Sequence, residues 1–331
     1  MLISQIGNYG IGETPMNRAL QFCPEGNLLV KLENHNRTGS SKDRLAYALF
    51  ASLLPHGHPN RPKMLFDSTS GNLGISMASL AAEFDMRFTA LIDETTPIEK
   101  MDKLREMGAE FIVVPRGNHP DDRTARICAA QELDGKDGWT WTNQYENPVG
   151  VRVHFETTGP EILRQAGGAV DVFVCSIGTG ATICGIASYL RRRCPNIEVV
   201  AVEPEGSTIF GGIVGPYATA GAGMLGPPGL ATRYGGVIDS YSKVPDLTAL
   251  QTCQGFTLCE SESVGITAGA VLYVARHLSC ERPNQTIVAL IADGGDSYRS
   301  LIETAGNGPL DPPIVRRASE LRLGWRSELC T

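Results

Sequence analysis

The stretch Ser40-Ser41-Lys42-Asp43-Arg44 follows the apolar run 28–32 (Leu-Leu-Val-Lys-Leu) and decides how the rest of the sequence is interpreted. The two serines are typical of a helix N-cap, and the apolar spacing that follows predicts a helix. A helix N-terminus disfavours the ammonium form of Lys42, and burial would act in the same direction. The segment is therefore compatible with an uncharged, nucleophilic amine. Taken alone, however, it is better explained by an ordinary solvated lysine, and the rest of the sequence has to decide between the two.

Composition and charge exclude several classes of protein. The 331 residues suffice for about two domains, and the net charge of -7 argues against nucleic acid as the main partner. There is no apolar run of membrane-spanning length and no signal-like N-terminal pattern, so no membrane association is expected. Nine cysteines lack CxxC pairs and metal-ligand spacing, which indicates free thiols, no metal and a reducing cytoplasm.

Short apolar runs alternate with helical patterns along the chain. Buried strands are predicted over 64–66, 87–92, 110–114, 170–175, 199–202 and 287–291. Helices are predicted near 71–84, 97–107, 120–133, 156–165 and 263–278, with one more ending near 192. This alternation predicts an α/β fold with parallel sheets covered on both faces. A polar break at 134–150 divides it into two units, and ligands are expected at the carboxyl ends of the strands.

Two loops stand at strand-to-helix junctions. Residues 176–182 (Ser-Ile-Gly-Thr-Gly-Ala-Thr) offer backbone N–H groups and hydroxyls suited to a phosphate, without a dinucleotide or P-loop spacing. Residues 68–74 (Ser-Thr-Ser-Gly-Asn-Leu-Gly) suit a carboxylate or a phenolic oxygen. An ordinary tight turn or a cap is the simpler alternative, above all for Thr267 at a later helix entry. The glycine- and proline-rich stretch 211–230 is expected to be an ordered loop near the same face.

Taken together, these segments resemble the cysteine synthase / cystathionine β-synthase family of fold-type II enzymes, which use pyridoxal 5′-phosphate. The resemblance runs in order from 11–15 to 293–298, and its other matching pieces are 31–33, 40–44, 68–74, 143–148, 156–161 and 178–182. It implies two doubly wound parallel-sheet domains with the active site between them. The larger, phosphate-binding domain would be 1–44 with 150–310, the smaller substrate domain 45–149, and 311–331 a C-terminal extension. The resemblance also implies a homodimer.

The resemblance implies a role for each matching position. Lys42 would be the catalytic residue and the Schiff-base lysine. Asn72 would hydrogen-bond the ring oxygen of the cofactor, and Thr267 would face its pyridine nitrogen. The cofactor phosphate would be bound by Gly178, Thr179, Gly180, Ala181 and Thr182. The substrate carboxylate would be bound by Ser68, Thr69, Ser70, Gly71 and Gln144.

These roles imply a PLP-dependent transferase. A hydroxyl at the pyridine nitrogen favours expulsion of a group from the β-carbon over transamination. The implied reaction is β-replacement on O-phosphoserine or O-acetylserine through an aminoacrylate, with Lys42 moving the α-proton. The product would be cysteine or a β-substituted alanine such as N-(2-amino-2-carboxyethyl)-glutamate.

Departures from the family pattern bear on the nucleophile. Four local motifs look most like a siderophore-pathway branch that condenses O-phosphoserine with glutamate on the way to 2,3-diaminopropionate. They are residues 68–75, 143–147, 206–211 and 295–296. Arg37 replaces a family proline and could bind a phosphate or a dicarboxylate, or could be a surface arginine. Residues 95–100 (Thr-Thr-Pro-Ile-Glu-Lys) replace the family's Met-Ser-x-Glu-Arg loop. Sulfide remains open as the nucleophile.

Two other classes compete with this interpretation. A serine/threonine dehydratase-type PLP lyase has the same fold, but it usually shows an all-glycine phosphate loop, which residues 178–180 do not match. A catalytically idle binding module is disfavoured because both the lysine and the phosphate loop are retained.

Overall fold

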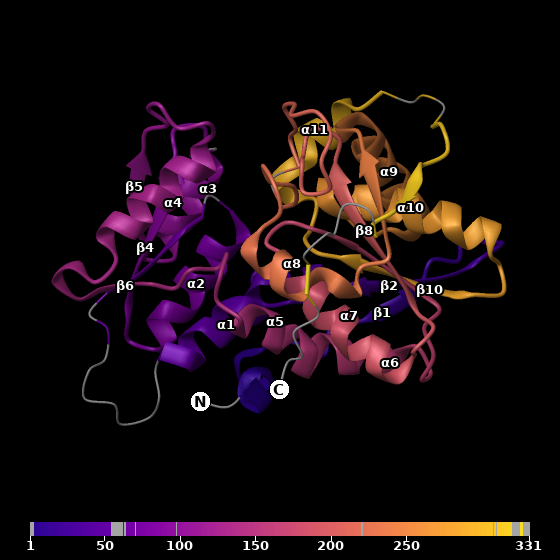
Figure 1. Ribbon diagram of the computed structural model, residues 1–331, viewed down its shortest axis with the longest axis horizontal. Coiled ribbons are helices and arrows are strands. Elements are labelled where there is room, and N and C mark those ends of the chain that lie inside the picture. The colour runs from indigo at the N-terminus through magenta and orange to yellow at the C-terminus, as the bar shows by residue number, and fades with distance from the viewer. Residues whose placement is uncertain are drawn as a thin grey trace.

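Two mainly parallel β-sheets organise the chain, one in each half of the molecule (Figure 1). The computed structural model describes residues 3–53, 62, 64–69, 71–96, 98–219, 221–306, 308, 310–319 and 325–326. Helices pack on both sheets, so the structure has the α/β fold that the alternating pattern predicts.

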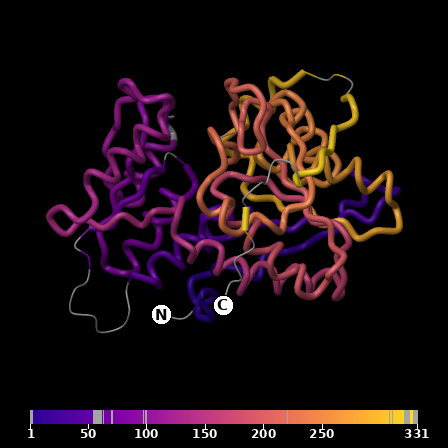
Figure 2. The backbone as a smooth tube through the Cα atoms, viewed as in Figure 1, coloured from indigo at the N-terminus to yellow at the C-terminus, as the bar shows by residue number. Residues whose placement is uncertain are grey.

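The larger sheet has seven strands from distant parts of the sequence. In spatial order they are β1 (Met16–Arg18), β2 (Asn27–Leu32), β10 (Thr286–Ile291), β7 (Val172–Ser176), β8 (Glu198–Pro204), β9 (Ser240–Val244) and β11 (Val315–Arg317). The five central strands are parallel, whereas β1 and β11 are antiparallel to their neighbours. The chain therefore forms β1 and β2 in this half, crosses to the other half and returns, as Figure 2 shows.

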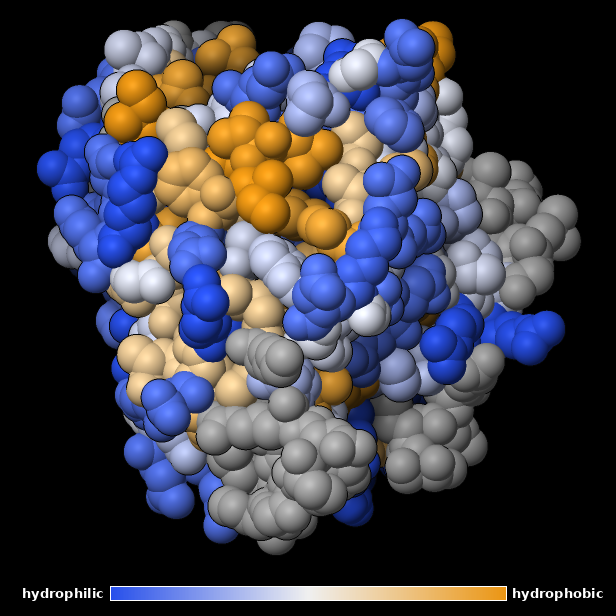
Figure 3. Space-filling model, turned by 90° about the vertical axis from the view of Figure 1, so that its left-hand side faces the viewer, coloured by the Kyte–Doolittle hydropathy of each residue, from blue (hydrophilic) through white to orange (hydrophobic). Residues whose placement is uncertain are grey.

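The smaller sheet has four parallel strands. They are β5 (Glu110–Val114), β4 (Arg87–Asp93), β3 (Met64–Ser68) and β6 (Trp139–Trp141), in spatial order. Figure 3 looks onto the outer end of this half and shows an apolar area framed by hydrophilic side chains. The edge strand β5 leaves Ile112 and Val113 39% and 45% exposed. All four strands lie within residues 45–149, but the domain boundaries themselves stay a prediction.

The helices connect the strands and cover the sheets. Those of the described residues are α1 (Lys42–Leu53), α2 (Asn72–Glu83), α3 (Ile98–Glu106), α4 (Asp122–Leu133), α5 (Val149–Val153), α6 (Gly159–Gln165), α7 (Ala181–Arg193), α8 (Gly229–Tyr234), α9 (Asp246–Glu260), α10 (Ile266–Glu281) and α11 (Arg299–Thr304). A π-helical turn, His154–Thr158, joins α5 to α6. No described helix combines the length and apolar character needed to cross a membrane.

The core forms on both faces of the larger sheet. Along β7, Val172 and Val174 belong to the cluster beneath α9 and α10, whereas Phe173 and Cys175 belong to the cluster beneath α7. Successive side chains of a strand point to opposite faces, so a strand covered on both faces must be apolar throughout. This explains the continuous apolar runs of the sequence. The described cysteines are free thiols.

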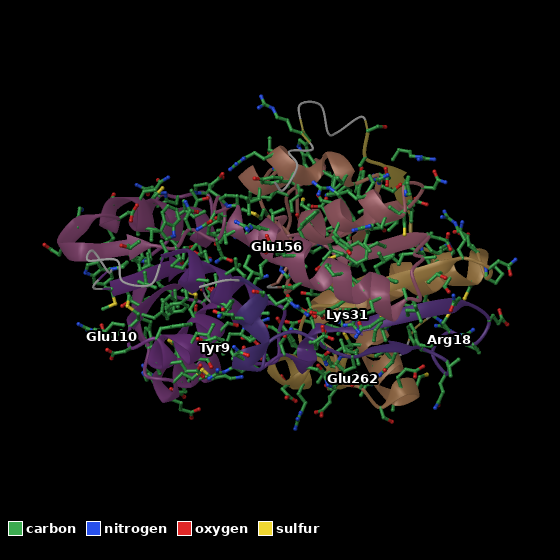
Figure 4. All side chains as sticks on the ribbon, turned by 90° about the horizontal axis from the view of Figure 1, so that it is seen from below. Tyr9, Arg18, Lys31, Glu110, Glu156 and Glu262 are labelled. Atoms are coloured by element: carbon green, nitrogen blue, oxygen red, sulfur yellow. The ribbon has the colours of Figure 1, made fainter. Side chains whose placement is uncertain are left out.

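Four buried charges join the start of α1 to the larger sheet. The Arg44 guanidinium donates to both carboxylate oxygens of Glu33 and to both of Glu161, each at 2.7 Å. Lys31 donates to Glu161 at 2.8 Å and to the carbonyl oxygen of Thr14 at 2.7 Å. Figure 4 shows Lys31 inside the larger half, whereas Glu110 lies at the outer edge of the smaller one. Every charge in this ion network has an opposite partner, which offsets the cost of desolvation.

Replacing Glu33 by Gln should lower the free energy of unfolding by about 3–5 kcal/mol, because Arg44 would lose a charged partner in a buried site. The pKa of Glu33 is lowered from 4.5 to about 2, against the effect of burial, mainly by Arg44. Its stabilising contribution is therefore present above pH 4.5 and is lost as the pH falls toward 2. Urea denaturation of the wild type and the variant at pH 7 and pH 4 measures both effects.

Glu110→Gln is the matched control, because Glu110 pairs with Arg87 at the exposed surface. Its removal should change the free energy of unfolding by no more than about 0.5 kcal/mol. A loss below about 1 kcal/mol in Glu33→Gln would contradict the stabilising role of the ion network.

Candidate active site

A cavity of about 800 Å³ opens where the carboxyl ends of strands from both sheets meet. Its lining includes Ser176 at the end of β7, Asp93 at the end of β4 and Ala292 just after β10. Residues 214–217, 221 and 223–225 also line the cavity, so the described part of the glycine-rich stretch does lie at this face. A ligand here would contact both halves of the molecule, as expected for parallel α/β sheets.

Lys42 is the first residue of α1, and its half-buried side chain lines the cavity. The loop before it is fixed to the end of β10, because the Ser41 N–H donates to the Ala292 carbonyl at 2.9 Å. Burial lowers the pKa of Lys42, and the nearby Asp293 carboxylate opposes this shift. The structure thus supplies the two conditions, helix start and desolvation, that favour a neutral amine.

The phosphate loop lies on the larger-sheet side of the cavity. Gly178, Thr179, Gly180 and Thr182 line it, whereas Ala181 is buried and its N–H donates to the Thr179 hydroxyl at 3.4 Å. Gly180 has a φ of +90°, and a Cβ there would lie 2.9 Å from the backbone nitrogen of Ala231. Glycine is therefore required, and the loop keeps an open concavity at the N-terminus of α7.

His154 supports this loop from behind. Its Nε2 lies 3.2 Å from the Thr182 hydroxyl and its Nδ1 lies 2.9 Å from the Thr158 hydroxyl. Burial, with the Arg44 cation next, lowers the pKa of His154 to about 3, so the ring is neutral at pH 7. It can therefore donate one hydrogen bond and accept the other, which fixes the Thr182 side chain. No local sequence pattern signals this contact, because the two residues lie on different elements.

Thr267 lies in the first turn of α10 and also lines the cavity. Its hydroxyl is buried and has no hydrogen-bond partner within the described part of the chain. A Cβ on Gly221 would lie 2.8 Å from this oxygen, so only glycine fits beside the hydroxyl without a steric conflict. A buried hydroxyl without a partner is costly unless a ligand supplies one.

The loop at 68–74 that the sequence predicts to bind a carboxylate, called the carboxylate loop below, lies with its described residues on the smaller-sheet side of the cavity. Thr69, Gly71 and Asn72 line it, and the Thr69 hydroxyl accepts from the Gly71 and Gly74 N–H groups at 3.4 and 3.2 Å. Ser68 is fully buried and does not line the cavity. Ser70 lies outside the described residues. The N-terminus of α2 therefore opens onto the cavity.

Gln144 also lines the cavity and is positioned by β3. Its side-chain amide donates to the Ser68 carbonyl at 2.8 Å, and its backbone N–H donates to Asp67 at 3.1 Å. Burial raises the pKa of Asp67 to about 6, although Thr142 and Trp141 also donate to it. Asp67 is a positioning residue that sequence reasoning missed.

Arg37, like Ser68 and Ala181, is a predicted site residue that does not line the cavity. Its guanidinium pairs with Glu83 at the end of α2, and it is absent from the lining. Arg37 therefore adds no group to the cavity lining, and we assign it no substrate-binding role.

Asp293 is a lining residue whose role was not predicted. It is 4% exposed, and its Oδ2 accepts from the Asn72 amide at 3.0 Å. Its Oδ1 has no hydrogen-bond partner among the described residues, and burial raises its pKa. An acidic residue two positions after the end of a buried strand was the available sequence signal. No group of acidic, histidine or cysteine side chains in the described residues could hold a metal ion.

Comparison with known proteins gives a consistent result. The family model described as pyridoxal-phosphate dependent enzyme matches residues 8–293. A cysteine synthase of Staphylococcus aureus is 33% identical over 295 residues, covering 88% of this chain and 94% of that protein. The O-ureido-L-serine synthase of Streptomyces lavendulae is 33% identical over 294 residues, covering 88% and 89%. A crystal structure of O-ureido-L-serine synthase, 30% identical, superimposes with a TM-score of 0.82 over 91% of this chain and 96% of that one.

The chain therefore belongs to the pyridoxal-phosphate dependent enzymes, and its fold is of type II. It is a transferase similar to the cysteine synthases, its cofactor is pyridoxal 5′-phosphate, and it performs β-replacement on an O-activated serine. The family resemblance seen in the sequence and the predicted fold class and cofactor are confirmed.

The residues present fit this cofactor. The concavity that Gly178 and Gly180 keep open suits its phosphate, and the unpartnered Thr267 hydroxyl suits its ring nitrogen. Lys42 lines the same cavity and would hold its aldehyde carbon, while Asn72 would donate to its ring oxygen. These residue roles are our proposal.

Replacing Gly180 by Ala should weaken pyridoxal phosphate binding at least tenfold, because a Cβ would press the loop against Ala231. Gly167→Ala is the matched control, since Gly167 also has a positive φ, +73°, but a Cβ there would meet no other atom within 4 Å. The control should lose about 1–2 kcal/mol of stability and no cofactor affinity. Titration of the apoproteins, followed by visible absorbance, measures the binding; equal affinity of both variants would contradict the role of the loop.

Proposed function

We propose that the donor substrate is O-phospho-L-serine and that the nucleophile is the amino group of an amino acid such as glutamate. The product would be a β-substituted alanine such as N-(2-amino-2-carboxyethyl)-glutamate. The observation that supports an anionic donor is that Arg116, Arg123 and Arg126 line the same cavity as Lys42. Guanidinium groups match phosphate and carboxylate geometry better than other side chains do.

Cysteine formation from O-acetylserine and sulfide is the second candidate. It is favoured by the 33% identity to a cysteine synthase over most of both chains. The two candidates share the roles of Lys42 and of the residues that would bind the cofactor and the substrate α-carboxylate, and they differ in the leaving group and the nucleophile.

Lys42 carries the proton transfer in this proposal. When bound, pyridoxal phosphate withdraws electrons from the α-carbon of the amino acid joined to it, which labilises the α-proton and the β-substituent. The Lys42 amine, whose pKa is lowered by burial, accepts the α-proton and later returns it. Asp293 opposes this shift and so limits how far the pKa of Lys42 falls.

The loop at the start of α2 would bind the substrate carboxylate. Thr69, Gly71 and the helix N-terminus would offer donors on one side, and Gln144 would lie on the other. Fixing the carboxylate orients the α-proton toward Lys42, which is how positioning lowers the barrier. The predicted homodimer and the division into domains 1–44 with 150–310 and 45–149 remain part of this proposal.

Mass spectrometry of products tests the proposal. The cofactor-loaded protein should convert O-phosphoserine and glutamate to N-(2-amino-2-carboxyethyl)-glutamate faster than it converts O-acetylserine and sulfide to cysteine. Lys42→Ala should lose at least about 10³-fold in turnover of either pair and should lack the visible absorbance of lysine-bound cofactor.

Two outcomes would contradict it. Preferential formation of cysteine would favour the second candidate, and release of pyruvate without an added nucleophile would favour a dehydratase. Full turnover by Lys42→Ala would remove the assignment of that lysine.

A further inference from the structure

Lys100 is a second amine in the active-site cavity. It lies in α3, near the start of that helix, and its half-buried side chain lines the cavity together with Lys42. Its ammonium has neither a hydrogen bond nor an ion pair within the described ranges of the chain. Its Nζ lies over the ring of Tyr298, 5.8 Å from the ring centroid.

Each of the three lining arginines has at least one hydrogen-bonding partner within the described residues and keeps further N–H groups for an anion. Arg126 pairs with Asp93, Arg123 donates to the Gly223 carbonyl at 3.0 Å, and Arg116 donates to the carbonyls of residues 119 and 120. Among the cavity-lining cations of the described residues, this leaves the side chains of Lys42 and Lys100 without a hydrogen-bonding partner. The cofactor accounts for Lys42, so Lys100 is the amine that still lacks an anion.

Nearby carboxylates do not neutralise Lys100 directly. Asp93 and Asp293 act on it only through space, and burial lowers its pKa more than they raise it. Asp93 is held by Arg126 and by the hydroxyls of Thr95 and Thr96, while Asp293 accepts from Asn72. A partly desolvated ammonium without a direct partner is costly and is stabilised by an anionic ligand.

The position of Lys100 places such a ligand beside the carboxylate loop. A Cβ on Gly71 would lie 4.0 Å from the Lys100 Nζ, so the amine lies next to the N-terminus of α2. The α-carboxylate of the donor already has the loop, the helix N-terminus and Gln144 as candidate partners. Lys100 can therefore bind a second anionic group of the substrates.

We propose that Lys100 is a specificity-determining residue that binds an anionic oxygen group of the substrates other than the donor's α-carboxylate. The shared chemistry is a phosphate or carboxylate, from either the leaving group of the donor or the side chain or carboxylate of an amino-acid nucleophile. This inference rests on the proposed function and deepens it.

Steady-state kinetics of Lys100→Met distinguish the two sources. Four substrate pairs are compared: O-phosphoserine or O-acetylserine, each with sulfide or glutamate. If Lys100 binds the leaving phosphate, the KM for O-phosphoserine rises at least tenfold with both nucleophiles, and that for O-acetylserine is unchanged. If it binds the nucleophile, the KM for glutamate rises at least tenfold with both donors, and that for sulfide is unchanged. Either result supports the proposal.

Two control variants separate charge from structure. Lys100→Arg keeps the cation and should stay within about threefold of the wild type. Lys103→Met removes an exposed lysine one turn further along α3 and should leave all four pairs unchanged. An unchanged KM in Lys100→Met, or an equal rise for every pair including O-acetylserine with sulfide, would overturn the proposal.

A binding measurement keeps the inference testable if none of the four pairs is turned over, which would be a failure of the proposed function alone. Calorimetric titration of the cofactor-loaded protein with inorganic phosphate and with glutarate gives two dissociation constants. Lys100→Met should weaken at least one of them tenfold or more, and Lys100→Arg should restore it. If Lys100→Met binds both probes as the wild type does, Lys100 binds no anion and the proposal is wrong.

Discussion

The ion network of Arg44, Glu33, Glu161 and Lys31 is the interaction on which the active site depends. Arg44 follows Lys42 by two residues in α1, so its four hydrogen bonds fix the first turn of the helix that carries the Lys42 amine, our proposed catalytic group. Its partner Glu161 lies in α6, directly after the turn that contains His154. Burying a charge costs desolvation free energy, and this cost is offset only when each charge has an oppositely charged partner. The same four groups thus connect Lys42 with the turn that contains His154, which in turn contacts Thr182 of the phosphate loop.

The cavity gathers the starts of four long helices. Lys42, Asn72, Thr182 and Thr267 lie in the first turns of α1, α2, α7 and α10, and all four line the same cavity. Each of these helices lies near the carboxyl end of a parallel strand, where such folds leave backbone N–H groups unpaired. The helix dipoles add their positive ends at one place. A site built in this way suits a ligand with an anionic tail and an anionic substrate group, while it disfavours the charged form of an amine.

Much of this arrangement was predictable from the sequence, because apolar runs and glycine loops are local signals. Each buried strand and each of the two loops is recognised from the residue types within a segment of about ten residues. The ends of β7 and β10 were predicted to within about two residues. Strand β6 was missed, because three half-exposed residues in a polar segment become a strand only by pairing with β3. The predicted helix over 156–165 begins instead as a π-helical turn, where Gly159 packs closely on Tyr189. Asp67, His154 and Lys100 owe their roles to neighbours distant in sequence, which no local pattern reveals.

The pairing of β2 with β10 has a consequence for biosynthesis. Asn27 and Thr286 are register partners although 259 residues separate them, whereas the four strands of the smaller sheet all lie between residues 64 and 141. Contacts that close long loops form slowly, and domains tend to fold as the ribosome releases them. The smaller half can therefore fold while the rest of the chain is still being synthesised. Strand β2 of the larger half, in contrast, can complete its pairing only after β10 has been synthesised. During that interval β2 carries an unpaired apolar edge, which makes the nascent chain a natural client for chaperones.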